Sequence, residues 1–384
     1  MFEHELNELE KKSQLRWTRI VEMCAGPRVV VDGKSLLLMC SNDYLGLAGH
    51  DALKKGAQAA LDRYNFGAGA SRLISGTSPL HEELETRTAR FKGTQAALLF
   101  NSGYAANTGI IPALAGSGDT ILSDSLNHAS IIDGCRLSRA RTLVYRHRDA
   151  NHAESLLKSA AAGRRFIITD GVFSMDGDLA PLPDLVVLAE RYDAVLIVDD
   201  AHGTGVMGSR GRGSTEHFHL EGRIPVQMGT FSKAFGSFGA FVAGDDDIIH
   251  YLINKARSFI FSTALPPAVC GASLAAIDIV EQDDKPKNRV WEARAQLLDG
   301  LERLGIAFGN TDSPIIPLVV GSSANANNLA SRLFELGVFA LAIRPPTVPE
   351  GTARIRLTVT ALHSRNDIDT VVAAFAVCKQ EGYL

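Results

Sequence analysis

The sequence contains few cysteines and none of the spacings by which cysteines usually hold a metal. Cys24, Cys40, Cys135, Cys270 and Cys378 lie far apart, and no C-x-x-C pair occurs. This pattern argues against a disulfide framework or a zinc site, and it predicts free thiols in a reducing compartment. The H-E-x-x-H motif is also absent, so we expect no metal.

Long apolar runs and an excess of positive charge are missing as well. No apolar stretch approaches the length that crosses a bilayer, and residues 1–16 are charged, unlike a signal peptide. The formal net charge of -4 gives no basic field that would hold a nucleic-acid backbone. We therefore expect a cytoplasmic protein that binds neither membranes nor nucleic acids.

What remains is the composition of an ordinary globular protein with room for one large and one smaller domain. The chain has 384 residues, of which 46% are hydrophobic and 21% are charged. We expect an N-terminal segment over residues 1–50, with an amphipathic helix at 3–20 and a hairpin at 28–40. A large domain would then cover residues 51–280 and a small C-terminal domain residues 281–384.

The central part of the chain alternates short apolar segments with helical ones, which indicates an α/β fold. Such alternation is typical of a mainly parallel sheet covered by helices on both faces. After Pro266-Pro267 we expect a long helical region at 268–304, broken by charged residues at 282–288, and then a smaller α+β domain. The predicted strands of the large domain are 96–100, 119–123, 141–145, 166–169, 195–198, 226–230 and 240–243.

Polar residues follow several of these strands directly, where parallel sheets form their sites. Asp199 comes at the end of an apolar strand, and His202 follows in the same loop. A carboxylate at that position can stay ionised against a cation. Taken alone, however, an Asp-x-x-His pattern is more often a helix cap or a turn.

Lys233 follows another buried strand, flanked by the hydroxyls of Thr230 and Ser232 and by Gly236. Burial lowers the pKa of a lysine and frees its amine to form a Schiff base with a carbonyl group. Surface lysines are far more common, so this feature is weak by itself.

Two further loops complete an ordered set. The segment 101–107 runs from a strand into a helix, and Gly103 lets the backbone approach a phosphate at the helix N-terminus. This loop lacks the G-x-G-x-x-G fingerprint of dinucleotide sites. His128 lies just past the next strand, where it either stacks on an aromatic ring or belongs to a helix-capping loop. A phosphate loop, a stacking histidine, a strand-end aspartate and a lysine are the parts that pyridoxal 5'-phosphate requires.

Over nearly its whole length the chain resembles the α-oxoamine synthase family of fold-type-I pyridoxal phosphate enzymes. That fold resembles aspartate aminotransferase, with a mainly parallel seven-stranded sheet and a smaller C-terminal α+β domain. The motifs that carry the resemblance are Ser41–Leu47, Gly69–Gly76 with His81 and Leu84-Glu85, Ser102–Asn107, Asn127–Ser130, Asp170–Asp178, Asp199–Gly205, Thr230–Gly236 and Arg344–Pro349.

The resemblance implies a role in catalysis or cofactor binding for several residues. Lys233 would hold the cofactor covalently, Asp199 would pair with its pyridine nitrogen, and His128 would stack on its ring. His202 and Ser174 would contact the phenolic oxygen of the ring. The expected phosphate ligands are the backbone at Gly103 and Tyr104, the hydroxyls of Thr230 and Ser232, and Thr263 from the second subunit of a homodimer.

The resemblance also implies substrates. Arg356 would grip the carboxylate of an amino acid, Arg16 and Thr347 would contact an acyl substrate, and Asn42 would lie in the substrate site. Sister enzymes typically carry a glutamate where this chain has Asp200. The aspartate at this position favours the member of the family that condenses L-alanine with a pimeloyl thioester, carried on coenzyme A or on an acyl carrier protein. The alternatives are a sister enzyme that uses glycine or serine, an aminotransferase, and a non-catalytic protein that binds the cofactor.

Overall fold

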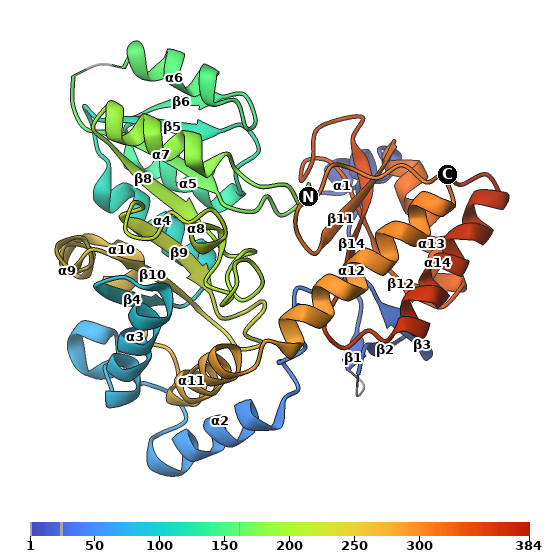
Figure 1. Cartoon of the computed structure of the whole chain (residues 1–384), viewed down its shortest axis with the longest axis horizontal. Coiled ribbons are helices and arrows are strands. Elements are labelled where there is room, and N and C mark those ends of the chain that lie inside the picture. The colour runs from blue at the N-terminus through green and yellow to red at the C-terminus, as the bar shows by residue number, and fades with distance from the viewer. Residues whose placement is uncertain (1, 24–25, 161) are drawn as a thin grey trace. The chain divides into compact units, whose positions relative to one another are not determined.

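The computed structural model describes residues 2–23, 26–160 and 162–384, so Cys24 lies outside the described residues. The chain forms two compact units (Figure 1). The large unit consists of Leu47–Ser174 and Leu179–Asp284. The small unit consists of the chain up to Gly46, Met175–Asp178 and Lys285–Leu384. The N-terminal segment thus folds together with the C-terminal part of the chain.

A mixed seven-stranded sheet forms the centre of the large unit, in the order β4-β10-β9-β8-β7-β5-β6. Strands β9, β8, β7, β5 and β6 run parallel, whereas β10 pairs antiparallel with both β4 and β9. The prediction of a mainly parallel seven-stranded sheet is therefore confirmed. The strands are β4 (Ala96–Phe100), β5 (Thr120–Asp124), β6 (Arg141–Tyr145), β7 (Arg165–Asp170), β8 (Ala194–Asp199), β9 (Val226–Thr230) and β10 (Ala240–Gly244).

Both faces of this sheet are buried, because side chains alternate between two hydrophobic cores along each strand. In β8, Ile197 belongs to the core that also contains Ile110 of α4, while Leu196 and Val198 belong to the core that contains Leu185 of α7. The helices of this unit are α2 (Asp51–Arg63), α3 (Pro79–Lys92), α4 (Gly103–Leu114), α5 (Ala129–Ser138), α6 (Ala150–Lys158), α7 (Leu182–Arg191), α8 (Ser214–His217), α9 (Asp246–Lys255), α10 (Arg257–Ile260) and α11 (Pro267–Gln282), with a π-helical turn η1 (Arg72–Gly76).

The small unit contains two further sheets. One has the order β1-β2-β3-β12 and the other β11-β14-β13. The predicted hairpin is confirmed as β2 and β3, and β3 also pairs in parallel with β12. The elements are α1 (Glu3–Lys11), β1 (Val21–Met23), β2 (Arg28–Val31), β3 (Lys34–Leu38), α12 (Lys285–Arg303), β11 (Ile315–Gly321), α13 (Ser323–Glu335), β12 (Val338–Phe339), β13 (Leu341–Ile343), β14 (Ala353–Thr358) and α14 (Arg365–Gln380).

Two helix predictions have opposite outcomes. The break in the long helical region is confirmed, since α11 ends at Gln282 and α12 begins at Lys285. The expectation of a helix up to residue 20 is wrong, because α1 ends at Lys11 and Ser13 adopts a left-handed φ of 53°. None of the residues of α1 is buried, so a continued helix would have no core to pack against.

Helices α2 and α11 cross at a pair of glycines. A Cβ atom on Gly56 would lie 2.5 Å from the carbonyl oxygen of Gly271, and one on Gly271 would collide with the carbonyl of Gly56. Only residues without a side chain allow backbones to approach this closely. The crossing therefore depends on both positions.

We expect Gly56→Ala to lower the free energy of unfolding by about 1–3 kcal/mol, because overpacking against backbone outweighs the gain in helix propensity. The matched control is Gly49→Ala, where nothing lies within 4 Å of the added methyl group. Thermal unfolding of both variants measures the effect. Equal midpoints would contradict the close crossing.

Candidate functional site

Three neighbouring strands of the large sheet end in buried aspartates. Asp124 ends β5, Asp170 ends β7 and Asp199 ends β8, and Asp170 pairs in register with Asp199. Their exposed fractions are 2%, 4% and 4%. Because carboxylates are costly to bury, each of them needs N–H donors or a nearby cation.

Asp199 accepts hydrogen bonds on both carboxylate oxygens. The backbone N–H of Ala201 lies 3.0 Å from its Oδ1, and Nδ2 of Asn107 lies 2.7 Å from its Oδ2. Asn107 comes from the first turns of α4 and is itself buried. The carboxylate is thus fixed in place at the end of β8, where both donors stabilise its negative charge.

His128 is the N-cap of α5, and its backbone is tied to the row of aspartates. Its N–H donates to Oδ2 of Asp170 at 2.7 Å. Burial and the charge of Asp199 raise the pKa of Asp170 well above the ordinary value, against the opposing effects of this N–H and of Lys233. Burial lowers the pKa of His128, and the charge of Lys233 adds to that shift while Asp199 opposes it. The His128 ring is therefore neutral near pH 7.

Lys233 lies in the bend that follows β9 and is half-buried. The bend closes through the N–H of Gly236, which donates to the carbonyl of Lys233 at 2.9 Å. Gly236 has a left-handed φ of 61°, and a side chain there would collide with the backbone nitrogen of Ala48. The charge of Lys233 lowers the pKa of both His128 and Asp170, so the lysine lies close enough to these two groups to influence their protonation.

His202 and Ser174 lie in the loops that follow two of the same strands. His202 is buried in the turn after Asp199, and Ser174 is half-buried in the turn after β7. The structure therefore brings the predicted set of Lys233, Asp199 and His128 to one edge of one sheet, with His202 and Ser174 in its loops.

The predicted phosphate site begins at the N-terminus of α4. Ser102 caps this helix, because its Oγ accepts from the N–H of Ala105 at 3.1 Å. A Cβ on Gly103 would lie 3.1 Å from Cγ2 of Thr230, so the helix start packs closely against the end of β9. Oγ1 of Thr230 is buried, and within the described residues it has no hydrogen-bond partner. Thr230 thus lies beside the N-terminus of α4, where the unpaired N–H groups of a helix can bind a phosphate.

The other predicted phosphate ligands are more exposed or are engaged through their backbone. Ser232 is exposed, and the exposed Tyr104 contacts Asp133 through its hydroxyl group. Thr263 forms a β-bridge with Ser71 and accepts from Asn101 Nδ2 at 2.9 Å through its carbonyl oxygen.

These residues fit the cofactor that the sequence predicts. A row of buried carboxylates suits a cationic pyridine ring and a lysine, and the unpartnered hydroxyl of Thr230 at a helix N-terminus suits a phosphate. The site therefore has carboxylates that suit the positive charge of the ring and a helix N-terminus that suits the negative charge of the phosphate.

The predicted substrate residues belong to the small unit and form two pairs. Arg356 in β14 is buried and donates to Oδ1 of Asn42 at 3.2 Å and to the hydroxyl of Tyr44 at 3.4 Å. Arg16 donates to Oγ1 of Thr347 at 3.4 Å and to the carbonyl of Pro345 at 3.2 Å. The first pair holds a guanidinium group in a buried position, where it can bind a carboxylate.

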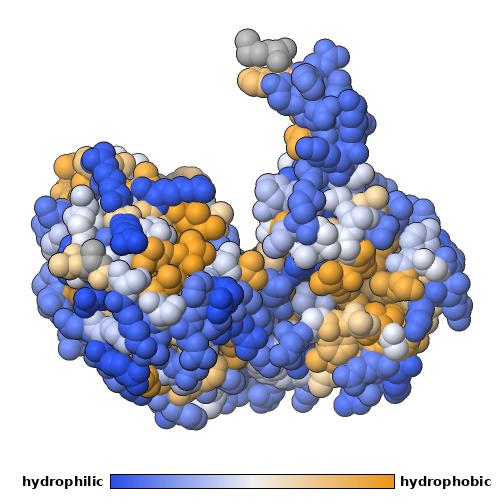
Figure 2. Space-filling view, turned by 90° about the horizontal axis from the view of Figure 1, so that it is seen from above, coloured by the Kyte–Doolittle hydropathy of each residue, from blue (hydrophilic) through white to orange (hydrophobic). Residues whose placement is uncertain are grey.

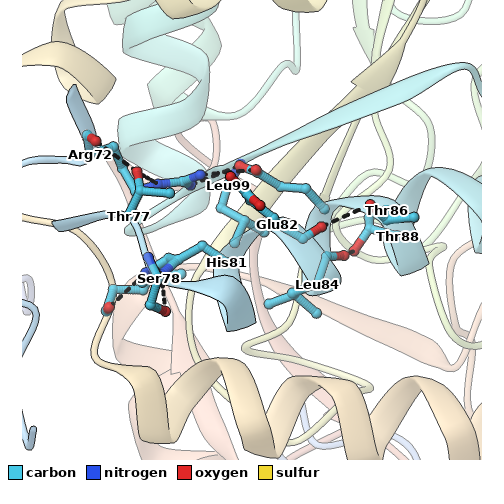
Figure 3. Close-up of polar contacts among 11 residues, drawn as sticks. Arg72, Thr77, Ser78, His81, Glu82, Leu84, Thr86, Thr88 and Leu99 are labelled. Carbon is cyan, nitrogen blue, oxygen red and sulfur yellow. Dashed lines mark hydrogen bonds and ion pairs between the residues drawn. The ribbon is translucent and has the colours of Figure 1, made fainter. Parts of the chain in front are cut away.

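Polar contacts link the motif block around Arg72 to the central sheet (Figure 3). Arg72 binds Glu85 through two hydrogen bonds of 2.7 and 2.9 Å, and Glu85 also accepts from the N–H of Leu99 in β4 at 3.0 Å. His81 contacts Oγ of Ser78 at 2.8 Å and the carbonyl of Leu265 at 2.9 Å. Together these contacts fix η1 and α3 against β4.

Asp200, next to Asp199, forms a buried ion pair that the sequence analysis did not identify. Nζ of Lys92 in α3 lies 3.3 Å from its Oδ2, with both side chains fully buried, and also contacts the carbonyl of Arg212. The N–H of Ser214 donates to both carboxylate oxygens. Burial lowers the pKa of Lys92 and raises that of Asp200, and the charge of each partner opposes these shifts. The pair holds the loop that carries His202.

Further residues of the site were not predicted from the sequence. Asp170 ends a strand just as Asp199 does, so the same argument from strand ends could have identified it. Asn107 and Ser130 belong to the quoted motifs but received no role. Asn107 is separated from Asp199 by 92 positions, and no local pattern links the two.

Comparisons with known proteins assign the family. A model of the aminotransferase class I and II family matches residues 34–375, and the chain belongs to this family. Within it, the chain is 53% identical over 375 residues to the 8-amino-7-oxononanoate synthase of Geobacter sulfurreducens, a match that covers 97% of this chain and 96% of the relative. It is 48% identical to the synthase of Thermoanaerobacter pseudethanolicus, over 96% of this chain and 94% of that one. The chain is thus also a member of the 8-amino-7-oxononanoate synthase family, a group within the predicted α-oxoamine synthases.

Solved structures agree with this fold. A serine palmitoyltransferase from S. paucimobilis with bound PLP and myriocin superposes with a TM-score of 0.95 at 30% identity, covering 99% of this chain and 98% of that one. The 8-amino-7-oxononanoate synthase of Francisella tularensis gives a TM-score of 0.79 at 28% identity, covering 91% of this chain and 99% of that one. The predicted fold-type-I architecture is confirmed.

We expect Lys92→Met to lower the free energy of unfolding by about 3–5 kcal/mol, because it leaves Asp200 as a buried carboxylate without its cation. Chemical denaturation measures the loss. The double variant Lys92→Met, Asp200→Asn removes both charges and should recover part of the lost stability. If the double variant is less stable than the single one, the two charges are not coupled as the geometry indicates.

Proposed function

We propose that the protein catalyses the decarboxylative condensation of L-alanine with a pimeloyl thioester, a step of biotin biosynthesis. The products would be 8-amino-7-oxononanoate, carbon dioxide and the free thiol of the carrier, which is coenzyme A or an acyl carrier protein. The proposal is carried by the 53% identity to a named synthase over nearly the whole of both chains. The site at the sheet edge supplies residues that suit this chemistry.

Pyridoxal phosphate, the proposed cofactor, supplies an electron sink for negative charge that develops on Cα of the amino acid. Lys233 would hold the cofactor and Asp199 would face its pyridine nitrogen. His128 would lie against the ring, and His202 and Ser174 would bind its phenolic oxygen. The N–H groups at Gly103 and Tyr104 would bind the phosphate together with Thr230, Ser232 and Thr263. The buried, unpartnered hydroxyl of Thr230 supports this assignment.

Lys233 also has the proposed role of acid and base. Its Nζ would take the proton from Cα of alanine and later return a proton to the same carbon after carbon dioxide leaves. Its position supports this role, since Lys233 follows β9 at the edge of the sheet where Asp199 ends β8 and His128 begins α5.

The small unit would bind the substrates through its two arginine pairs. Arg356, held by Asn42 and Tyr44, would grip the carboxylate of alanine with two parallel hydrogen bonds. Arg16 and Thr347, which contact each other, would bind the acyl substrate.

We further propose a cytoplasmic homodimer in which Thr263 of one subunit completes the phosphate site of the other. Large apolar side chains reach the surface of the large unit, among them Phe66 and Ile74, each 81% exposed, and Phe261 at 69%. Figure 2 shows hydrophobic surface between hydrophilic residues on the face that it displays. Within the described residues, no helix is both long and apolar enough to cross a membrane.

The alternative functions have less support. A sister enzyme that uses serine is represented by the palmitoyltransferase at 30% identity, compared with 53% for the synthase from Geobacter sulfurreducens. A non-catalytic cofactor-binding protein would have no need of the lysine and the substrate arginine together.

The proposal is tested by mixing the purified protein with pyridoxal phosphate and pimeloyl-CoA, and adding L-alanine, glycine or L-serine in separate samples. Thiol release and the mass of the product are recorded. We expect release with alanine and a product with the mass of 8-amino-7-oxononanoate. Release with glycine or serine instead would assign a sister activity. If no thiol is released from pimeloyl-CoA, the experiment is repeated with pimeloyl-acyl carrier protein. If no thiol is released from either donor, the proposed reaction is wrong.

We expect Lys233→Ala to lower turnover by at least about 10²–10⁴-fold, because the variant loses the group that moves the Cα proton. Steady-state thiol release with alanine measures the loss. Lys54→Ala, which removes an exposed lysine of α2, is the control and should keep normal turnover. A Lys233→Ala enzyme as active as this control would overturn the assignment.

Arg356→Lys should raise KM for alanine by about 10- to 100-fold, because lysine cannot form the two-pronged contact and charged hydrogen bonds contribute about 1.5–3 kcal/mol. Turnover at saturating alanine should fall less. Arg303→Lys changes an exposed arginine at the end of α12 and serves as the control. An unchanged KM for alanine in Arg356→Lys would remove Arg356 from the substrate site.

A further inference from the structure

Four side chains of the large unit form one continuous chain of hydrogen bonds, in which Asp199, Asn107 and Ser130 are buried and His128 at the end is exposed. Nδ1 of His128 lies 2.7 Å from Oγ of Ser130, and that Oγ lies 2.9 Å from Nδ2 of Asn107. The same Nδ2 lies 2.7 Å from Oδ2 of Asp199. Asn107 and Ser130 are each only 1% exposed and Asp199 is 4% exposed, so water does not compete for the two hydrogen bonds that Asn107 makes.

The chemistry of the four groups fixes the direction of each hydrogen bond. A carboxylate only accepts, so the amide of Asn107 must present Nδ2 and not Oδ1 to Asp199. Its two N–H groups then donate to Asp199 and to Ser130. The backbone N–H of Ser130 also points at Nδ1 of His128 and can only donate, so Nδ1 is an acceptor and the hydroxyl of Ser130 donates to it.

The ring of His128 is therefore held in one tautomer. Its Nδ1 accepts from the hydroxyl of Ser130 and also from the backbone N–H of Ser130 at 3.3 Å. Since burial lowers the pKa of His128, the ring is neutral, and its single proton must lie on Nε2.

We infer that Asn107 and Ser130 are positioning residues that couple the carboxylate of Asp199 to the orientation and tautomer of the His128 ring. This inference rests on the proposed roles of Asp199 at the pyridine nitrogen and of His128 on the ring face. Asn107 and Ser130 touch neither substrate nor cofactor in this scheme. Through Asn107 and Ser130, the carboxylate of Asp199 and the ring of His128 are held in fixed positions relative to each other before the cofactor binds.

A purely structural role is the competing explanation, because Asn107 and Ser130 also link α4 to α5. Gly134 of α5 packs directly against α4, since a Cβ there would lie 2.8 Å from the carbonyl oxygen of Asn107. Loss of packing would lower stability, but it would not select a histidine tautomer. The two explanations are therefore separated by a measurement on the ring itself.

The first readout is the tautomer of His128 in the apoprotein, measured from the ring nitrogen shifts of ¹⁵N-histidine-labelled protein and assigned with a His128→Asn sample. We expect wild-type protein to carry the proton on Nε2, and Ser130→Ala to show a mixture of tautomers. Ser138→Ala is the matched control. It removes another buried hydroxyl of α5, which donates to the carbonyl of Cys135 at 2.6 Å, and should leave the tautomer unchanged.

The second readout is the affinity for pyridoxal phosphate, measured by fluorescence titration of the apoproteins. Ser130→Ala and Asn107→Leu should weaken binding about tenfold, because each breaks a buried hydrogen bond of the assembly, and Ser138→Ala should not. Asn107→Ser replaces Asn107→Leu if the larger apolar change prevents folding. Wild-type tautomer and affinity in Ser130→Ala would overturn the inference, as would equal losses in Ser130→Ala and Ser138→Ala.

Asp199→Asn separates this inference from the proposed function. If Asp199→Asn binds the cofactor as tightly as wild type, the proposed role of Asp199 fails. If Asp199→Asn weakens binding and Asn107→Leu and Asn107→Ser do not, the role of Asp199 stands and the coupling through Asn107 is wrong.

Discussion

The structure depends on the burial of several carboxylates at one edge of the central sheet. Asp124, Asp170 and Asp199 end three adjacent strands, and Asp200 follows in the next position. Charge of one sign cannot be concentrated in this way without compensation. Each carboxylate is accordingly held by a different set of donors, and those donors determine the course of the loops. Asp124, for example, accepts hydrogen bonds of 2.9 Å from the backbone N–H groups of Leu126 and Arg148 and from Nδ1 of His147.

The groups that balance these charges differ between Asp200 and the other aspartates. Asp200 is matched by Lys92, a lysine buried with it, so this charge is balanced within the fold. The charge of Asp199 instead acts on His128 and that of Lys233 on Asp170, and His128 and Lys233 both lie in segments that follow strands of the sheet. Two aspartates adjacent in sequence thus differ: Asp200 fixes the loop, and Asp199 has the proposed role of providing charge for a cofactor. The direction of the strand explains this difference, because consecutive residues at its end point to opposite sides.

Much of this architecture could be predicted from the sequence, and the parts that could not are the contacts between distant positions. The seven strands were predictable because each is a short apolar segment next to glycine or polar residues, as at 96–100 and 226–230. Asp199, His202 and Lys233 were identifiable because they directly follow such strands. The pairing of Lys92 with Asp200 spans 108 positions and leaves no local pattern. The length of α1 was overestimated because an amphipathic pattern does not reveal whether a core is present to receive it.

Lys233 is proposed to bind the cofactor covalently, and a chemical labelling experiment tests this role. The protein would be mixed with pyridoxal phosphate, reduced with borohydride, digested and examined by peptide mass analysis. We predict that the mass of the reduced cofactor appears on the peptide that contains Lys233. Attachment to another lysine, such as Lys92, or no attachment at all would contradict this account of the site.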